Sequence, residues 1–252
     1  MTVTVKGIVL RTVQYGDFDK LCTILTEQGK IFFKARGIRS IINKNAAGCQ
    51  TFVYSEFQLE KKAEKYYLKT ARPLFTTVKA GSSIGTIALA SYFAELCEDT
   101  ALDAETGKMT LKLLMNALYL LGKGDRPEKL IKAVFELRLL AAGGLMPLLD
   151  ACSVCGKASE GEDFMWFRLL EGDLVCGDCR SREDENRMRL SRSTVLLIRR
   201  TVSVPEEEAY AVRVEENTLR EFSRFCERYL IVQLDRNYPS LKFYKEVELL
   251  PE

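Results

Sequence analysis

Two Cys-x-x-Cys pairs constrain this 252-residue chain more than any other feature of its sequence. Cys152 and Cys155 form the first pair, and Cys176 and Cys179 form the second, with 20 residues between the pairs. This spacing lets four thiolates surround one metal ion tetrahedrally. Because all four ligands are cysteines, no position is left for water, and the pattern predicts one structural Zn²⁺ per chain. Two disulfides, or a redox-active Cys-x-x-Cys pair, are the alternatives.

The other four cysteines are scattered, mostly in apolar segments, where reduced thiols behave as small hydrophobic side chains. They are Cys22, Cys49, Cys97 and Cys226. Their placement indicates a reducing compartment. The chain begins with a strand-like segment rather than a signal peptide, and it lacks the run of roughly 18 apolar residues that a membrane span needs. We therefore expect a soluble cytoplasmic protein without a membrane partner.

The net charge of +2 is distributed unevenly along the chain. Residues 1–79 contain 14 lysines and arginines against 6 acidic residues, whereas residues 80–252 contain 23 against 29. The first third therefore carries a net charge of +8 and the rest a net charge of −6. This asymmetry makes the N-terminal third the candidate for a polyanionic partner.

Five segments of the N-terminal third have the alternating pattern and the Val, Ile, Thr, Phe and Tyr content of β-strands. They are residues 2–13, 20–27, 30–37, 51–61 and 65–73. Five short strands in so few residues predict a small barrel. The segment from Gly37 to Gln50 is a long loop that carries Arg39 and Lys44, and such a loop on a small barrel is often a binding element.

The third predicted strand separates its side chains onto two faces, because the side-chain period of a strand is two. One face carries Lys30, Phe32, Lys34 and Arg36, and the other carries Ile31, Phe33 and Ala35. A basic face with an aromatic ring suits single-stranded nucleic acid, since cations neutralise phosphates and a ring stacks on bases. The alternative is a solvated barrel face. The candidate nucleic-acid-binding residues are Arg11, Lys20, Lys30, Phe32, Lys34, Arg36, Arg39 and Lys44.

From about residue 82 the apolar residues recur with the helical period, which predicts a helical bundle. Asp125 is a predicted N-cap for a helix that follows Gly124, and residues 181–189 form a predicted charged connector. Ser191 or Ser193 can cap the next helix, and residues 216–234 form the last strong one. That helix carries Arg220, Arg224 and Arg228 on one stripe. The stripe could meet phosphates, but a solvated face with a Glu216–Arg220 pair is the favoured interpretation.

The sequence offers little support for an enzyme. It contains no histidine, which excludes Ser-His-Asp and Cys-His catalysis and the His-x-Glu deaminase signature. It also lacks the glycine-rich patterns that cradle nucleotides. We therefore predict a non-enzymatic protein.

Several short segments, taken in this order, resemble the RecO family of bacterial recombination-mediator and DNA-repair proteins. The resemblance rests on residues 6–10 (KGIVL), 15–19 (YGDFD), 25–29, 35–39 (ARGIR), 93–96 (FAEL) and 234–240. It also rests on the four cysteines of the two Cys-x-x-Cys pairs, which we call knuckles. It implies an α+β multidomain protein with an N-terminal OB-fold, a helical domain and an inserted four-cysteine zinc module. We assign residues 1–79 to the OB-fold, 80–150 and 190–252 to the helical domain, and 151–189 to the insert.

The resemblance also implies a function in the RecF pathway of DNA repair. The resemblance implies a non-enzymatic protein that binds single- and double-stranded DNA and anneals complementary strands. Such a protein is expected to cooperate with RecR, to contact the C-terminal tail of SSB and to help load RecA onto SSB-coated DNA. This chain departs from the expectation in one place, because residues 40–48 hold few cations for a dominant DNA contact. The alternatives are a zinc-stabilised RNA-binding scaffold and a nucleic-acid enzyme with an unrecognised catalytic site.

Overall fold

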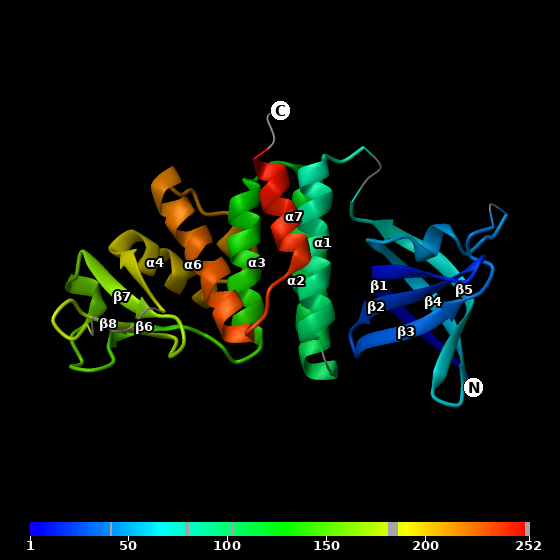
Figure 1. The fold of residues 1–252 in the computed structure, drawn as a ribbon, viewed down its shortest axis with the longest axis horizontal. Coiled ribbons are helices and arrows are strands. Elements are labelled where there is room, and N and C mark those ends of the chain that lie inside the picture. Colours follow the sequence, from blue (N-terminus) through cyan, green and yellow to red (C-terminus); the bar gives the residue numbers. More distant parts are fainter. Residues whose placement is uncertain (41, 79–80, 102, 181–185, 250–252) are drawn as a thin grey trace. The chain divides into compact units, whose positions relative to one another are not determined.

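The computed structural model describes the chain except residues 41, 79–80, 102, 181–185 and 250–252. Its contacts divide it into two compact units (Figure 1). The first unit contains Met1–Asp125 and Tyr238–Glu252, and the second contains Arg126–Asn237. The domain boundaries at residues 79, 150 and 190 mark changes in sequence pattern and stay a prediction. No helix among the described residues is long and apolar enough to cross a membrane.

A closed five-stranded barrel begins the first unit, and it confirms the predicted fold class. Neighbouring strands are antiparallel, except that β3 and β5 pair in parallel to close the barrel in the order β1-β2-β3-β5-β4. This is the topology of an OB-fold. All five predicted strands are present, with ends that differ by a few residues. The strands are β1 (Thr2–Tyr15), β2 (Asp19–Thr26), β3 (Gly29–Ala35), β4 (Val53–Lys62) and β5 (Lys65–Thr76).

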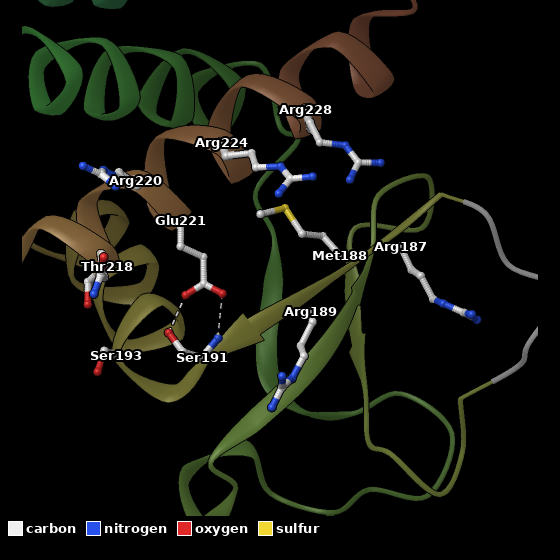
Figure 2. A pocket seen from close by; sticks show the side chains of 11 residues that line it. Arg187, Met188, Arg189, Ser191, Ser193, Thr218, Arg220, Glu221, Arg224 and Arg228 are labelled. Carbon is white, nitrogen blue, oxygen red and sulfur yellow. Dashed lines mark hydrogen bonds between the residues drawn. The ribbon is translucent and has the colours of Figure 1, made fainter.

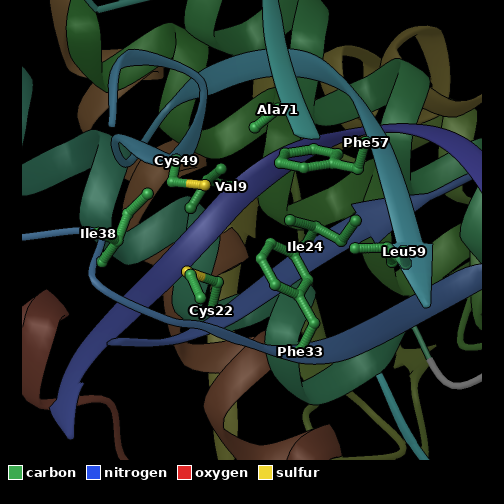
Figure 3. Packing of buried hydrophobic residues seen from close by; sticks show 10 residues of the cluster. Val9, Cys22, Ile24, Phe33, Ile38, Cys49, Phe57, Leu59 and Ala71 are labelled. Atoms are coloured by element: carbon green, nitrogen blue, oxygen red, sulfur yellow. The ribbon is translucent and has the colours of Figure 1, made fainter. Parts of the chain in front are cut away.

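The barrel core consists of apolar side chains from all five strands (Figure 3). Phe33 of β3 lies in this core with only 3% of its surface exposed, and its ring centroid is 5.4 Å from that of Phe57. Phe32, the preceding residue, is 58% exposed. The predicted assignment of β3 side chains to an inner and an outer face is therefore confirmed.

The loop that follows β3 packs onto the barrel instead of extending into solvent. Its described residues form no strand, as predicted, but they include the short 3-10 helix η1 (Ala47–Cys49). Ile38 and Cys49 are buried in the barrel core, and Ser55 donates a hydrogen bond to the carbonyl of Gly48 at 2.8 Å. Much of this loop therefore serves as core.

Three helices complete the first unit. Gly107 of α2 lies against the β2–β3 turn so closely that a Cβ atom there would stand 2.4 Å from the backbone nitrogen of Gly29. Tyr238, which precedes α7, donates to Asp99 of α1 at 2.9 Å, and Ser240 of α7 donates to Glu95 of α1. The sequence did not predict α7 as a helix. The helices are α1 (Ile84–Thr100), α2 (Ala104–Lys123) and α7 (Pro239–Glu248).

The second unit combines four helices with a four-stranded sheet in the order β6-β8-β7-β9. Phe167 of β7 joins the two layers, because its ring lies 4.9 Å from that of Phe225 and 5.2 Å from that of Tyr229, both on α6. The strands are β6 (Leu148–Cys152), β7 (Phe164–Arg168), β8 (Asp173–Val175) and β9 (Arg187–Ser191). The helices are α3 (Glu128–Ala142), α4 (Arg192–Ser203), α5 (Glu206–Tyr210) and α6 (Glu216–Leu234).

Most helix predictions in this unit are confirmed, but the predicted cap of α3 and part of the predicted connector are wrong. The predicted bounds of α6 match, and Ser191 accepts from the backbone N–H of Thr194 as the N-cap of α4. Asp125 is not a cap, because α3 begins after Pro127 without a side-chain cap. Residues 181–185 of the predicted connector lie outside the described residues. Residues 187–189 belong to β9, since Met188 and Leu190 alternate inward between charged neighbours.

Candidate nucleic-acid interface and metal centre

A groove of about 630 Å³ crosses the outer surface of the barrel from β1 to the start of β5. Arg11, Phe32, Lys34 and Arg36 line it, so the fold brings together half of the predicted nucleic-acid-binding residues. Three tyrosines that sequence reasoning missed line the same groove. They are Tyr15, Tyr66 and Tyr67. We name this site the barrel groove.

Strand register explains why these side chains meet. Residues that are directly opposite one another on paired strands point to the same face. Phe32 of β3 lies opposite Thr23 of β2, which in turn lies opposite Arg11 of β1. A second row runs across four strands and ends at a tyrosine supplied by the parallel closure of the barrel. Its members are Val13, Leu21, Lys34 and Tyr67.

Lys34 has an acidic partner inside this surface. Its Nζ atom lies 2.8 Å from Asp19 Oδ2 and 4.3 Å from the centroid of the Tyr15 ring. The hydrogen bond from Lys34 lowers the pKa of Asp19, and a second one from the backbone N–H of Gly37, at 2.8 Å, acts in the same direction. Asp19 therefore stays charged to lower pH than an ordinary aspartate, and its carboxylate already occupies the Lys34 ammonium group.

Two other cations of the barrel groove, Arg36 and Arg11, are less restrained. Arg36 stacks on the ring of Tyr67, with its guanidinium carbon 4.9 Å from the ring centroid. Stacking of this kind orients the guanidinium plane without using its N–H donors. Arg11 is exposed and lies 4.0 Å from Glu98 of α1. Arg36 is therefore better placed than Lys34 or Arg11 for a phosphate contact.

The remaining four predicted residues do not line the barrel groove. Lys30 donates to the carbonyl of Glu98 in the last turn of α1, where a cation is favourable. Arg39 donates to the carbonyl of Asp17 at 2.9 Å. Lys44 is exposed on the loop after β3, and Lys20 lies next to Leu21 on β2, so its side chain points to the other face of that strand.

The barrel groove offers both of the chemical features that a single strand needs. Its cations can neutralise phosphates, and Phe32 and Tyr15 present rings that are 58% and 52% exposed. Val13 and Leu21 are also exposed, at 42% and 41%, and they widen the apolar floor between the rings. An exposed apolar floor with a cationic rim is suited to unpaired bases and their backbone.

The four cysteines of the two knuckles converge in the second unit, as predicted. Their Sγ atoms all lie within 4.8 Å of one another, and those of Cys155 and Cys176 are 3.8 Å apart. A tetrahedral site with metal–sulfur bonds of about 2.3 Å would place its sulfurs about 3.8 Å apart. All eight cysteines of the chain are free thiols, which does not favour the disulfide alternative. The four knuckle cysteines can therefore hold one metal ion.

The backbone of the knuckles prepares Cys152 to act as a thiolate. Burial by itself would raise the pKa of Cys152, but hydrogen bonds from the backbone N–H groups of Cys155, Cys176 and Val154 outweigh it and bring the pKa to about 6. These donors are available because Cys152 ends β6 and the chain then turns back, with Gly156 N–H donating to the Cys152 carbonyl at 2.9 Å. Donors aimed at sulfur are the environment that a metal-bound thiolate requires.

Two family models match this chain along nearly its whole length. "Recombination protein O N terminal" matches residues 1–76, and "Recombination protein O C terminal" matches residues 81–242. The chain belongs to the RecO family. The first RecO model ends at the C-terminal end of the barrel, and the second covers the helices together with the four-cysteine site.

Similar proteins support the same assignment. The chain is 30% identical to the DNA repair protein RecO of Alkaliphilus metalliredigens over 250 residues, which cover 98% of this chain and 100% of that protein. It is 29% identical to the DNA repair protein RecO of Acetivibrio thermocellus over 243 residues, 96% of each chain. It is 30% identical to the DNA repair protein RecO of Symbiobacterium thermophilum over 242 residues, 95% of each chain. The match to these RecO proteins therefore includes the barrel groove and the cysteine site.

Proposed function

We propose that this RecO family member is a recombination mediator that binds single-stranded DNA in the barrel groove and anneals complementary strands without covalent chemistry. One observation carries the proposal: exposed rings and cations share one groove on an OB-fold barrel. In the RecF pathway, the protein would act with RecR, contact the C-terminal tail of SSB and help RecA to load onto SSB-coated DNA. It would do so in the bacterial cytoplasm.

Annealing by such a surface has a simple physical basis. Two single strands repel each other through their phosphates, and cations on a protein reduce this repulsion. Bases that stack on Phe32 stay unpaired and accessible while the strand is bound. A contact with SSB would raise the local concentration of protein at strands that are already unpaired. None of these steps requires a nucleotide cofactor.

We propose that the ion held by the four cysteines is Zn²⁺ and that it stabilises the second unit. Four thiolates with tetrahedral spacing match the preference of zinc and leave no position for a reacting water. When bound, the ion would supply structural free energy and no catalytic chemistry. The residues that hold it would be Cys152, Cys155, Cys176 and Cys179.

An annealing assay tests the proposed function directly. Two complementary oligonucleotides, one with a donor dye and one with an acceptor dye, are mixed with the protein in buffer without nucleotide and without free metal ions. We expect faster annealing than in the protein-free reaction. A requirement for ATP, or cleavage of either strand, would instead favour the alternative of a nucleic-acid enzyme. Tighter binding to an RNA of the same sequence would favour the RNA-binding scaffold.

The Asp19–Lys34 pair leads to a prediction about affinity. Asp19→Asn removes the charge that holds Lys34, while the amide oxygen can still accept from Gly37 N–H. We expect tighter binding to single-stranded DNA and a log-log salt slope that is steeper by about 0.7, because Lys34 becomes free to neutralise one more phosphate. Fluorescence anisotropy titrations at several salt concentrations measure both quantities.

Asp17→Asn is the matched control for this prediction. It removes the same charge two residues away, and no ion pair between Asp17 and Lys34 is formed among the described residues. An equal gain in both variants would show that net charge alone is responsible and would contradict the release of Lys34.

A further inference from the structure

A second groove, of about 730 Å³, lies in the second unit between β9 and α6 (Figure 2). Its described lining is strongly basic, with five arginines and a single carboxylate, Glu221. The arginines are Arg187 and Arg189 on β9, and Arg220, Arg224 and Arg228 on α6. We name this site the arginine groove. It shares no lining residue with the barrel groove.

Two periodicities determine where these arginines lie, and those of β9 point away from α6 (Figure 2). On α6 they are four residues apart, so they lie on one side of the helix at intervals of about 6 Å along its axis. Arg220 pairs with Glu216 as the sequence predicted, whereas Arg224 and Arg228 lie farther along the groove, toward Met188 (Figure 2). On β9, Met188 is buried, and the arginines on either side of it therefore point to the opposite face of the strand.

The carboxylate of Glu221 is already engaged by other groups. Glu221 accepts from the backbone N–H of Ser191 at 3.1 Å and from the Ser191 hydroxyl group (Figure 2). It also accepts from the hydroxyl group of Thr194. These partners form the N-terminal end of α4, where the helix dipole favours a negative charge. Glu221 therefore serves this helix end, and the groove keeps an excess of positive charge.

The rings next to the arginine groove are covered by guanidinium groups. Arg189 lies 3.9 Å from the centroid of the Phe164 ring, and Arg187 and Arg180 lie 5.4 and 4.7 Å from that of Trp166. These guanidinium groups occupy a face of each ring, as Lys34 and Arg36 do on Tyr15 and Tyr67 of the barrel groove. The arginine groove thus offers charge next to cation-covered rings, whereas the barrel groove also presents the exposed ring of Phe32.

We propose that the arginine groove binds the phosphate backbone of double-stranded DNA. A duplex hides its bases and carries one negative charge per about 1.7 Å of helix axis, which matches a surface of guanidinium groups without open rings. Guanidinium groups also bind phosphate oxygens in a bidentate geometry that lysine cannot reproduce. The inference rests on the proposed function, because it gives the product of annealing a site separate from the one that holds the single strand.

The test uses the full chain with the double substitution Arg224→Ala/Arg228→Ala and a fluorescent DNA duplex of about 20 base pairs. If each arginine neutralises one phosphate, the log-log salt slope for the duplex becomes shallower by about 1.8. The affinity difference from the unmodified protein then widens about 60-fold between 1 M and 0.1 M salt. The slope for a single-stranded oligonucleotide should not change.

Two further variants make this result specific. Lys108→Ala/Lys112→Ala removes two exposed cations with the same spacing from α2, outside both grooves, and should leave the duplex slope unchanged. Arg224→Lys/Arg228→Lys keeps both charges and should keep most of the slope while weakening the affinity. An unchanged duplex slope in the alanine variant, or an equal loss for the single strand, overturns the assignment. Phe32→Ala tests the barrel groove separately, so a failure of the inference and a failure of the proposed function remain distinguishable.

Discussion

Replacing Cys152 with serine lowers the melting temperature by roughly 10–20 °C. Three thiolates hold a zinc ion poorly, and most of the binding free energy of a structural zinc site is folding free energy. A loss on the order of 5 kcal/mol corresponds to this temperature shift in a protein of about this size. Differential scanning calorimetry measures the shift, and metal analysis should give about one zinc in the unmodified protein and less in the variant.

Val154→Ser is the matched control, because Val154 lies in the same knuckle and is 64% exposed. Its backbone N–H, which helps Cys152 to act as a thiolate, is retained. We expect this variant to melt within a few degrees of the unmodified protein. A metal-free protein with unchanged stability would contradict a structural role for the ion and would leave the redox alternative. Affinity of the barrel groove for single-stranded DNA should change far less than stability, since the cysteines lie in the other unit.

Phe32→Ala should weaken binding to single-stranded DNA by roughly 5- to 150-fold, the equivalent of one lost stacking contact. The side chain carries no charge, so the salt slope should stay unchanged. Because the ring is 58% exposed, the melting temperature should also change little. Anisotropy titrations at several salt concentrations and a thermal melt check the three expectations. Phe32→Tyr, which keeps a ring, should restore most of the affinity, whereas Phe32→Leu should not.

Phe33→Ala should give the opposite pattern. Its side chain is 3% exposed and packs against Phe57, so its removal should reduce stability by about 3–5 kcal/mol. Under conditions in which the variant is folded, its affinity for single-stranded DNA should be close to that of the unmodified protein. If Phe33→Ala instead weakened binding without a loss of stability, stacking by Phe32 would be the wrong explanation.

Local patterns in the sequence predicted the parts of this fold that depend on local physics. The alternation in β3 placed Phe32 outward and Phe33 inward, and cysteine spacing predicted the cluster of four thiols. Both signals arise within a few residues, where geometry is fixed by the period of a strand or by the turn of a knuckle. The DNA-binding role of Phe32 stays a prediction.

The rest of the barrel groove depends on pairings between distant segments. Tyr67 reaches Lys34 only because β3 and β5 pair in parallel, and Asp19 reaches it only because β2 and β3 pair in one register. Tyr66 and Tyr67 are adjacent aromatic residues at the start of a predicted strand. This pair was the one feature of the sequence that could have indicated their rings as part of the site. Local sequence patterns do not show which distant segments pair with each other in the fold.

The arginine stripe of α6 shows the same limit. Helical period placed Arg220, Arg224 and Arg228 on one side of the helix, and the Glu216–Arg220 pair was predicted correctly. Periodicity does not say what lies opposite that side. The neighbouring strand, β9, begins within residues 181–189, whose composition predicted a charged connector.

The last helix, α7, belongs to the unit that the first strand begins. The ribosome adds residues in order, and domains generally fold as they emerge. All of Arg126–Asn237 is therefore synthesised before the residues that anchor α7 to α1. Until those residues are added, α1 lacks its contacts with Tyr238 and Ser240. A chain truncated before Tyr238 would thus contain every residue of the later unit and lack one helix of the earlier unit.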